Sequence, residues 1–237
     1  MNLLRPIASL FGYDVIRKSK DRLRDRHLHN LFIKHQVETV IDVGANQGQY
    51  GQFLRSIGFS GSIISFEPLS DAFKTLSALS ENDPNWHVYN HALGDTETEM
   101  TINVSNYSDF SSFLAPTTYS KDTFQHKSEV IRQETVKIKV LDSLFDELPG
   151  TDTRRIHLKM DTQGFDLNVF KGVQQHLEQI QTMQSEISIR ELYEGMPDYL
   201  TALKTYTDAG FTISGLFPVT RDKNDLSVIE FDCVMVK

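Results

Sequence analysis

The chain has 237 residues, which is enough for one α/β domain with a sizeable core. Its net charge of −8 disfavours the backbone of a nucleic acid as a partner, so we expect no nucleic acid. The single cysteine, Cys233, excludes an intrachain disulfide and a cysteine-rich zinc site. Together with the lack of a secretory signal and of an apolar run of transmembrane length, it predicts a cytoplasmic protein.

Residues 1–37 are predicted to form an N-terminal helical extension, with one helix over about 20–35. The extension is basic, and most of its charge comes from six cations: Arg17, Lys18, Lys20, Arg22, Arg24 and Arg26. The simplest interpretation is a solvated helix face. A peripheral contact with anionic lipid or with a phosphorylated carrier is the alternative, and a homodimer is also compatible with the sequence.

A glycine-rich turn follows the first predicted strand, at about residues 38–43, and leads into a helix at about 48–57. Small residues in such a turn let a ligand approach the backbone at the head of an α/β sheet. A dinucleotide fingerprint would need glycines where the chain has Asn46 and Gln49, and no Gly-Lys-Ser/Thr of a P-loop is present. The turn therefore predicts a nucleoside site built from Asp42, Gly44, Asn46, Gly48 and Tyr50.

The next two predicted strands supply further contacts for a nucleoside. The strand at about 62–67 ends in Glu67, roughly 20 residues past the glycines, where a carboxylate accepts both ribose hydroxyls. An ordinary solvated glutamate at a strand end is the alternative. The strand that begins at Trp86 runs into Asn90 and Ala92, which offer a polar group and a small surface to an adenine ring.

Residues 97–140 interrupt the alternation of strands and helices and are predicted to form a β-rich insertion. Alternating side chains indicate antiparallel strands at about 100–104 and 135–140. The loop between them mixes aromatic residues with serines, including Ser111 and Ser112. This composition is typical of a substrate mouth, with disorder as the alternative, and Tyr193 is expected to complete the mouth.

Two acids belong to apolar strands in the second half of the chain. Asp161 ends the strand at about 156–161 and so falls on the same rim of the sheet as the glycine turn; a helix N-cap is its alternative role. Glu186 lies inside the strand at about 185–191, where an unpaired carboxylate is costly. It is therefore a candidate partner for a cation or a substrate hydroxyl, with an ion pair to Arg190 as the alternative.

Three segments taken together resemble the FkbM family of class I S-adenosylmethionine-dependent methyltransferases: the turn at 40–50, the Lys-Met-Asp-Thr-Gln-Gly block at 159–164 and the Glu-Phe-Asp at 230–232. The likeness covers residues 38–237 and implies a Rossmann-like methyltransferase domain. Such a domain has a central, mostly parallel seven-stranded sheet with helices on both faces. Its antiparallel last strand comes from a terminal hairpin, here about 211–217 and 228–236.

The resemblance implies S-adenosylmethionine-dependent O-methylation of a hydroxyl on a sugar, a glycan or a small natural product. Gln163 stands where the family often has a glutamate, and an amide cannot deprotonate a hydroxyl, so Asp161 is the expected base or metal ligand with Glu186 assisting. A divalent metal on Asp161, Asp166 and Glu186 is an alternative to the metal-free site that we favour. The residues also leave open a non-catalytic nucleoside-binding domain, an N-methyltransferase and a nicotinamide-dependent oxidoreductase.

Overall fold

The computed structural model of the protein describes residues 22–237. The cations expected at Arg17, Lys18 and Lys20 lie outside the described residues. The predicted helix of the N-terminal extension is present as α2, Arg22–His35. Within the described part of the chain, no helix has the length and apolar character needed to cross a membrane.

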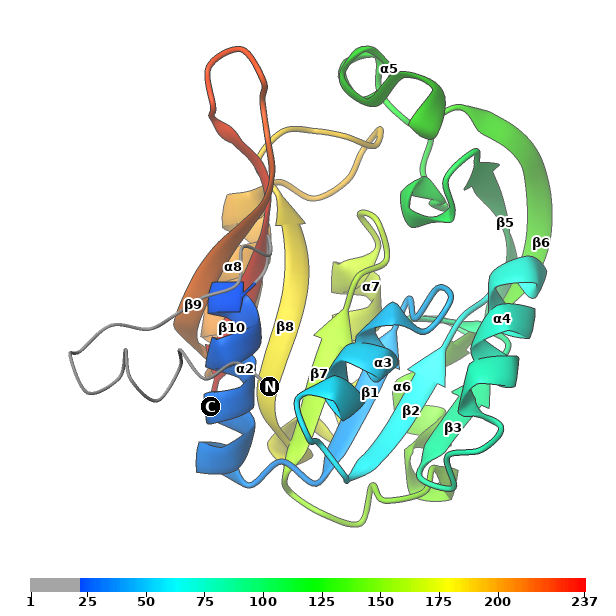
Figure 1. Ribbon diagram of the computed structural model, residues 1–237. Coiled ribbons are helices and arrows are strands. Elements are labelled where there is room, and N and C mark those ends of the chain that lie inside the picture. The colour runs from blue at the N-terminus through cyan, green and yellow to red at the C-terminus, as the bar shows by residue number, and fades with distance from the viewer. Residues whose placement is uncertain (1–21) are drawn as a thin grey trace, which may run out of the picture.

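A seven-stranded sheet forms the centre of the molecule, in the order β3-β2-β1-β7-β8-β10-β9 (Figure 1). Strands β3, β2, β1, β7 and β8 run parallel, and β10 is antiparallel to both of its neighbours. The strands are β1 Thr39–Val43, β2 Ser62–Phe66, β3 Trp86–Tyr89, β7 Ile156–Met160, β8 Ile180–Ser188, β9 Thr212–Arg221 and β10 Val228–Val236. This arrangement confirms the predicted fold class, including the terminal hairpin that places the last strand inside the sheet.

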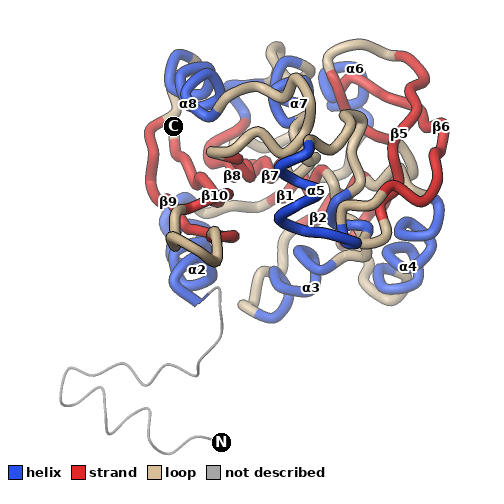
Figure 2. Tube along the Cα trace, turned by 90° about the horizontal axis from the view of Figure 1, so that it is seen from above, coloured by secondary structure: helices blue, strands red, loops and turns tan. Residues whose placement is uncertain are grey.

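Helices cover both faces of the sheet (Figure 2). On one face lie α2, α3 (Gln49–Ser56) and α4 (Ser70–Ser80), which bury Leu28, Leu54 and Leu76 against the sheet. On the other face lie α6 (Leu141–Leu144), α7 (Asp166–Lys171) and α8 (Tyr199–Asp208), which contribute Leu141, Phe170 and Tyr206 to the larger core cluster. Because each helix faces the sheet with an apolar stripe, the two clusters hold the strands in a rigid layer.

The β-rich insertion pairs with β4, which lies just before it in the chain, in a second, three-stranded sheet of the order β4-β6-β5. Its strands are β4 Ala92–Gly94, β5 Thr98–Ser105 and β6 Val130–Val140, with the 3-10 turn η1 (Ser108–Phe110) and the helices α5 (Thr118–Phe124) and η2 (Gln125–Lys127) between β5 and β6. An isolated bridge joins Pro116 to Tyr193, so the insertion is attached to the loop that follows β8. Seen from above, α5 lies over the ends of the parallel strands (Figure 2).

Strand β8 is longer at its start than the expected strand at 185–191, and it ends earlier, at Ser188. Polar residues stand at the beginning of this strand, so the sequence does not indicate a buried strand there. Their side chains are hydrogen-bonded: Thr182 with His157, and Gln184 with Tyr50 and Asp232. Polar groups with hydrogen-bond partners can be buried in a central strand at little cost.

Candidate active site

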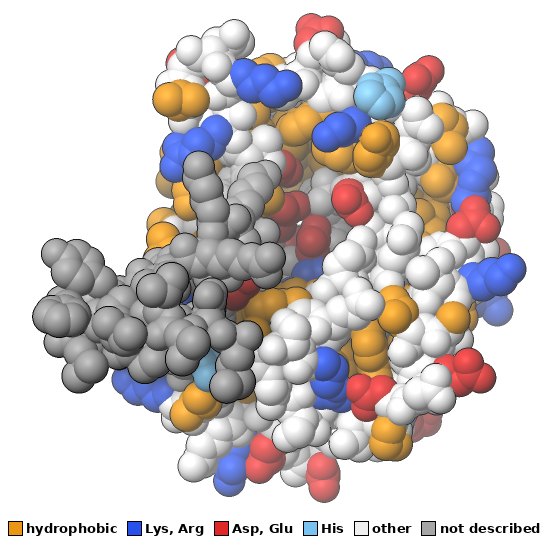
Figure 3. Space-filling model, in the orientation of Figure 1, with side chains coloured by type: hydrophobic (Ala, Val, Ile, Leu, Met, Phe, Trp, Pro, Cys, Tyr) orange, Lys and Arg blue, Asp and Glu red, His pale blue; other side chains and the backbone are white. Residues whose placement is uncertain are grey.

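A cleft of about 440 Å³ opens at the carboxyl ends of the parallel strands. In the space-filling view, acidic side chains gather in this hollow (Figure 3). Open α/β sheets bind their ligands at this edge. The structure brings eight of the predicted site residues into the lining of the cleft: Gly44, Asn46, Tyr50, Glu67, Ala92, Ser111, Asp161 and Glu186.

The glycine turn is held between two strand ends by contacts that admit no side chain at its first glycine. Gly44 has a φ of +75°, and a Cβ atom there would lie 2.0 Å from the carbonyl oxygen of Asp161. The amides of Gly44 and Ala45 both donate to the carbonyl of Phe66. Since an L-residue is strained at this φ and the neighbouring atoms are backbone, only glycine fits. The turn therefore has a fixed shape against the ends of β2 and β7.

Glu67 lies beside the turn with both carboxylate oxygens already engaged by the backbone. One oxygen accepts the amide of Asn46 at 2.8 Å, and the other accepts the amide of Leu69 at 2.8 Å. Burial raises the pKa of Glu67 to about 7. Each carboxylate oxygen has two acceptor sites, so one lone pair per oxygen is left for a ligand that offers two adjacent hydroxyls. This geometry suits a ribose.

A buried ion pair stands beneath the turn. The ammonium group of Lys159 lies 3.0 Å from Asp42 and 3.5 Å from Asp161, and it donates to the carbonyl of Gly44 at 3.2 Å. Burial opposes its charge, but the two carboxylates outweigh burial and raise the pKa of Lys159. Asp42 itself is fully buried and forms none of the cleft lining. It therefore orients the turn through Lys159.

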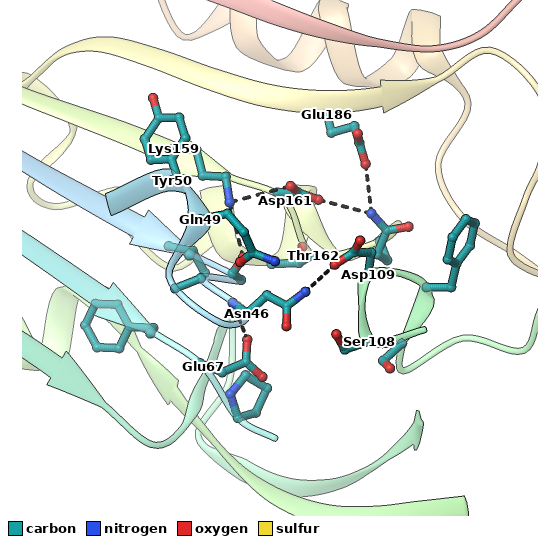
Figure 4. A pocket seen from close by; sticks show the side chains of 18 of the residues that line it. Asn46, Gln49, Tyr50, Glu67, Ser108, Asp109, Lys159, Asp161, Thr162 and Glu186 are labelled. Atoms are coloured by element: carbon teal, nitrogen blue, oxygen red, sulfur yellow. Dashed lines mark hydrogen bonds and ion pairs between the residues drawn. The ribbon is translucent and has the colours of Figure 1, made fainter. Parts of the chain in front are cut away.

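Asp161 and Glu186 are joined by one side chain. The amide nitrogen of Gln163 donates to Asp161 at 3.0 Å and to Glu186 at 2.8 Å. Figure 4 shows Glu67 and Asn46 toward one end of the cleft and Glu186 toward the other, with Asp161 between them. Burial, followed by the negative charge of Asp161, raises the pKa of Glu186 well above its usual value. The two acids therefore share one donor, the amide of Gln163, and Glu186 binds its proton more tightly than an ordinary glutamate does.

The far end of the cleft is also acidic. Glu230 and Asp232 of β10 line it, and burial raises the pKa of Glu230 to about 7. Arg24 of α2 forms an ion pair with Asp232 at 2.8 Å, so this cation of the N-terminal extension faces the cleft. Six acids and two basic residues line the cleft, and this balance favours a cationic ligand.

A comparison with models of protein families matches the Methyltransferase FkbM domain over residues 42–213. The chain belongs to this family. The match includes the glycine turn, Glu67, the Asp161–Gln163 block and Glu186, and it confirms the predicted family. The protein is therefore a methyltransferase of the S-adenosylmethionine-dependent class. No curated protein matches the chain.

Solved structures resemble this FkbM domain only distantly. Fibrillarin from Aeropyrum pernix, solved with bound S-adenosyl-L-methionine, has 11% identity and a TM-score of 0.48, over 84% of this chain and 66% of that one. An rRNA methylase from Streptococcus thermophilus has 11% identity and a TM-score of 0.48, over 94% of this chain and 99% of that one. The methyltransferase domain of bacterial CtHen1-C has 8% identity and a TM-score of 0.49, over 92% and 98% of the two chains.

The lining of the FkbM cleft fits S-adenosylmethionine. Glu67 offers two free lone pairs to the ribose, Ala92 offers a small surface, and the excess of acids suits the positive charge of a sulfonium. Gly48 does not line the cleft; it caps α3 with a φ of +90°, and a Cβ there would lie 3.1 Å from Leu76. Asn90 also lies outside the lining, because its amide donates to the carbonyls of Glu67 and Pro68.

The insertion contributes to the site differently from what its composition indicates. Ser111 lines the cleft, and Asp109 of η1 accepts a hydrogen bond from the side chain of Asn46. Ser112 and Tyr193 stand behind the lining, where both hydroxyls donate to Gln163. The insertion therefore contacts the glycine turn through Asp109 and the backbone of Gln163 through Ser112, and Tyr193 of the loop after β8 supplies the second hydroxyl to Gln163.

The structure excludes the alternative role considered for each of the two central acids. Asp161 does not cap α7; Asp166 accepts the amide of Thr162 at 2.8 Å and the hydroxyl of Ser185 at 2.6 Å instead. Arg190 is exposed, and the partner of Glu186 is Gln163. Across residues 22–237, no group of three histidine, cysteine, aspartate or glutamate side chains is arranged to hold a metal ion.

Lys159 and Gln163 are site residues that the sequence alone does not identify. The apolar strand around Lys159 favours a structural role, yet this residue lines the cleft and joins Asp42 to Asp161. The signal that identifies it is the register of the sheet, because Asp42 and Lys159 are directly paired between β1 and β7. Gln163 cannot act as a base, but its side-chain amide donates hydrogen bonds to Asp161 and Glu186.

Proposed function

We propose that the protein transfers the methyl group of S-adenosylmethionine to a hydroxyl oxygen of a sugar or a small natural product. The observation that carries this proposal is the Asp161–Glu186 pair, which stands in the same cleft as the nucleoside end at Glu67. An alcohol holds its proton tightly, so methylation at oxygen needs a proton acceptor beside the acceptor group. Methylation at a neutral amine does not need a strong base.

The nucleoside end of the cleft binds and orients the cofactor. Glu67 would accept the ribose hydroxyls, and the backbone of the turn at Gly44 and Asn46 would hold the methionine part. When bound, S-adenosylmethionine supplies a methyl group that is already activated by the positive sulfur. The protein's task is to place the acceptor oxygen in line with the methyl–sulfur bond and to take up its proton.

The other end of the cleft receives the acceptor. Asp161 and Glu186 face it together, and Glu230 with Asp232 extends an acidic wall beyond them. Carboxylates accept hydrogen bonds from hydroxyls, and several of them in one wall suit an acceptor that carries several hydroxyl groups. This wall supports a sugar or a polyhydroxylated natural product over an apolar acceptor.

The test is methyl transfer to a panel of sugars, glycosides, hydroxylated natural products and amines, with the methyl position assigned by mass spectrometry and NMR. We expect a methyl ether as the product. Asp161→Asn and Glu186→Gln should lower kcat by at least roughly 100-fold while binding of S-adenosylhomocysteine changes little. Glu99→Gln, at an exposed position of the insertion, is the matched control and should behave as wild type.

Two results would redirect the assignment. Exclusive methylation of amines, with a rate that follows the ionisation of the amine, would show an N-methyltransferase. Tight binding of S-adenosylhomocysteine without transfer to any compound of the panel, together with normal binding by Asp161→Asn, would favour a nucleoside-binding domain without catalysis.

A further inference from the structure

Gln163 occupies an unusual position between the two carboxylates of the site. Its φ is +52°, in the left-handed region that few residues other than glycine adopt. Such a backbone conformation costs free energy and persists where the surroundings enforce it. The hydroxyl of Ser112 donates to its backbone carbonyl at 2.7 Å, and Gly164 follows it with a φ of +91°. The turn therefore presents this one side chain to the cleft in a fixed direction.

Every polar atom of the Gln163 side chain is used. The nitrogen donates one hydrogen to Asp161 at 3.0 Å and the other to Glu186 at 2.8 Å. The oxygen accepts the hydroxyl of Tyr193 at 2.7 Å. An ionised carboxylate only accepts hydrogen bonds, so the nitrogen end of the amide must face the acids and the oxygen end must face the phenol. The orientation of the amide follows from its partners.

The two carboxylates that share this amide have unequal surroundings. Asp161 lies 3.5 Å from the ammonium of Lys159, which is an ion-pair partner for it. Glu186 has no cation within salt-bridge distance among residues 22–237, and the charged groups that raise its pKa most are acids: Asp161 from the end of β7, and Glu230 and Asp232 from β10. Two cations, Lys159 and Arg24, line the same cleft. The second oxygen of Glu186 has no hydrogen-bond partner in the described part of the chain, whereas the first is bound by Gln163.

We propose that Gln163, held by Tyr193, is a positioning residue that fixes Glu186 as the proton acceptor of the reaction and leaves Asp161 as the ion-pair partner of Lys159. This inference rests on the proposed function and assigns the two acids different roles. Pairs of titratable groups that sit in different environments commonly divide the work of catalysis in this way.

In the transfer step, the acceptor oxygen forms a bond to the methyl carbon while the carbon–sulfur bond breaks. The electron pair of the broken bond stays on the sulfur, which becomes a neutral thioether. The hydroxyl proton passes to the free oxygen of Glu186 and leaves to solvent after the transfer. Gln163 makes no bond in this step. It keeps one oxygen of Glu186 occupied, so that the other faces the acceptor.

The experiment follows the carboxyl carbon of Glu186 by 13C NMR as the pH is varied, in protein saturated with S-adenosylhomocysteine, and Glu186→Gln assigns the signal. Gln163→Met keeps the length of the side chain and removes both donors. We expect the titration midpoint of Glu186 to rise by about one pH unit, because the charged form loses a donor. Tyr193→Phe should move it in the same direction by less. Gln133→Met is the matched control, since its amide donates to the side chain of Asn103 and to no acid.

Calorimetric binding of S-adenosylhomocysteine shows that each variant is folded, and if Gln163→Met does not fold, Tyr193→Phe decides the question. A midpoint that stays unchanged in a folded Gln163→Met protein, or in Tyr193→Phe alone when Gln163→Met does not fold, overturns the inference. This readout needs no acceptor, so a shifted midpoint without methyl transfer supports the positioning role and removes only the proposed function.

A second measurement uses an acceptor. We expect Gln163→Met to lower kcat about tenfold at neutral pH, with recovery of kcat at higher pH and an unchanged KM for S-adenosylmethionine. A loss of kcat that does not depend on pH contradicts the positioning role.

Discussion

Glu67 is the residue on which the cofactor assignment can be tested most directly, by Glu67→Gln and by pH. Both oxygens of its carboxylate accept backbone amides, from Asn46 and from Leu69. A glutamine would turn its NH2 group toward one of these N–H donors, and it would lose one of the two acceptor positions for the ribose. The substitution therefore keeps the shape of the side chain while it removes the bidentate contact.

The magnitude follows from the charge and from the titration of this carboxyl. A hydrogen bond to a charged group is worth about 1.5–3 kcal/mol, so the loss of one predicts binding that is roughly 10- to 150-fold weaker. Burial raises the pKa of Glu67 to about 7. The ribose needs the ionised form, so the affinity of the wild-type protein is complete above about pH 8 and falls as the pH drops through about 7. Between pH 8 and pH 6 we expect it to fall about tenfold.

The assay is calorimetric titration with S-adenosylhomocysteine at pH 6, 7 and 8, for the wild-type protein and for Glu67→Gln. The variant should bind weakly and should lose the part of the pH dependence that Glu67 causes, whereas titration of the ligand's own amine remains in both proteins. Equal affinities of the two proteins at pH 8 would refute the ribose contact. Equal slopes with pH would refute the raised pKa as the origin of the pH effect.

The remaining predictions concern stability and are measured by urea unfolding. Gly51→Ala should destabilise the protein by about 1–3 kcal/mol, because its Cβ would lie 2.1 Å from the ring of Trp86, and a gain in stability would contradict this packing. Lys159→Met should cost about 3–5 kcal/mol by leaving Asp42 buried without its cation, and Asp42→Asn in the same chain should recover part of the loss. Burial lowers the pKa of His157 to about 3, so wild-type stability should fall by up to about 1.4 kcal/mol per unit as the pH drops below about 6.5, and His157→Gln should remove this slope; an unchanged slope would count against the neutral, buried imidazole.

The fold and the nucleoside end of the site could be predicted because their signals are local in the sequence. Gly44 and Asn46 stand in one turn directly after β1, and Glu67 follows directly after β2. The terminal hairpin could also be predicted, because two strands at the end of the chain are typical of the methyltransferase sheet that the sequence resembles. Each of these features depends on residues that are neighbours along the chain or on adjacent elements.

The acceptor end could be predicted only in part, because its contacts depend on register and on long-range docking. The pairing of Asp42 with Lys159 follows from the alignment of β1 with β7, which one sequence does not reveal. The sequence predicts Tyr193 at the mouth of the site, but the bridge to Pro116 docks the insertion over it and leaves the side chain 1% exposed. Its hydroxyl therefore serves Gln163.

A second tyrosine and glutamine repeat the arrangement around Gln163 at the other acid of the wall. The hydroxyl of Tyr50 donates to Gln184 at 3.2 Å, and the amide of Gln184 donates to Asp232 at 3.0 Å. In both cases a phenol fixes an amide, and the amide delivers its N–H to a carboxylate in the cleft. A buried carboxylate needs donors, and an amide supplies them without a positive charge. Asp232 also pairs with Arg24 at 2.8 Å, whereas Glu186 has no cation within salt-bridge distance in the described part of the chain. Neutral donors therefore hold one oxygen of Glu186 where no cation does, and at Asp232 they add to the ion pair with Arg24.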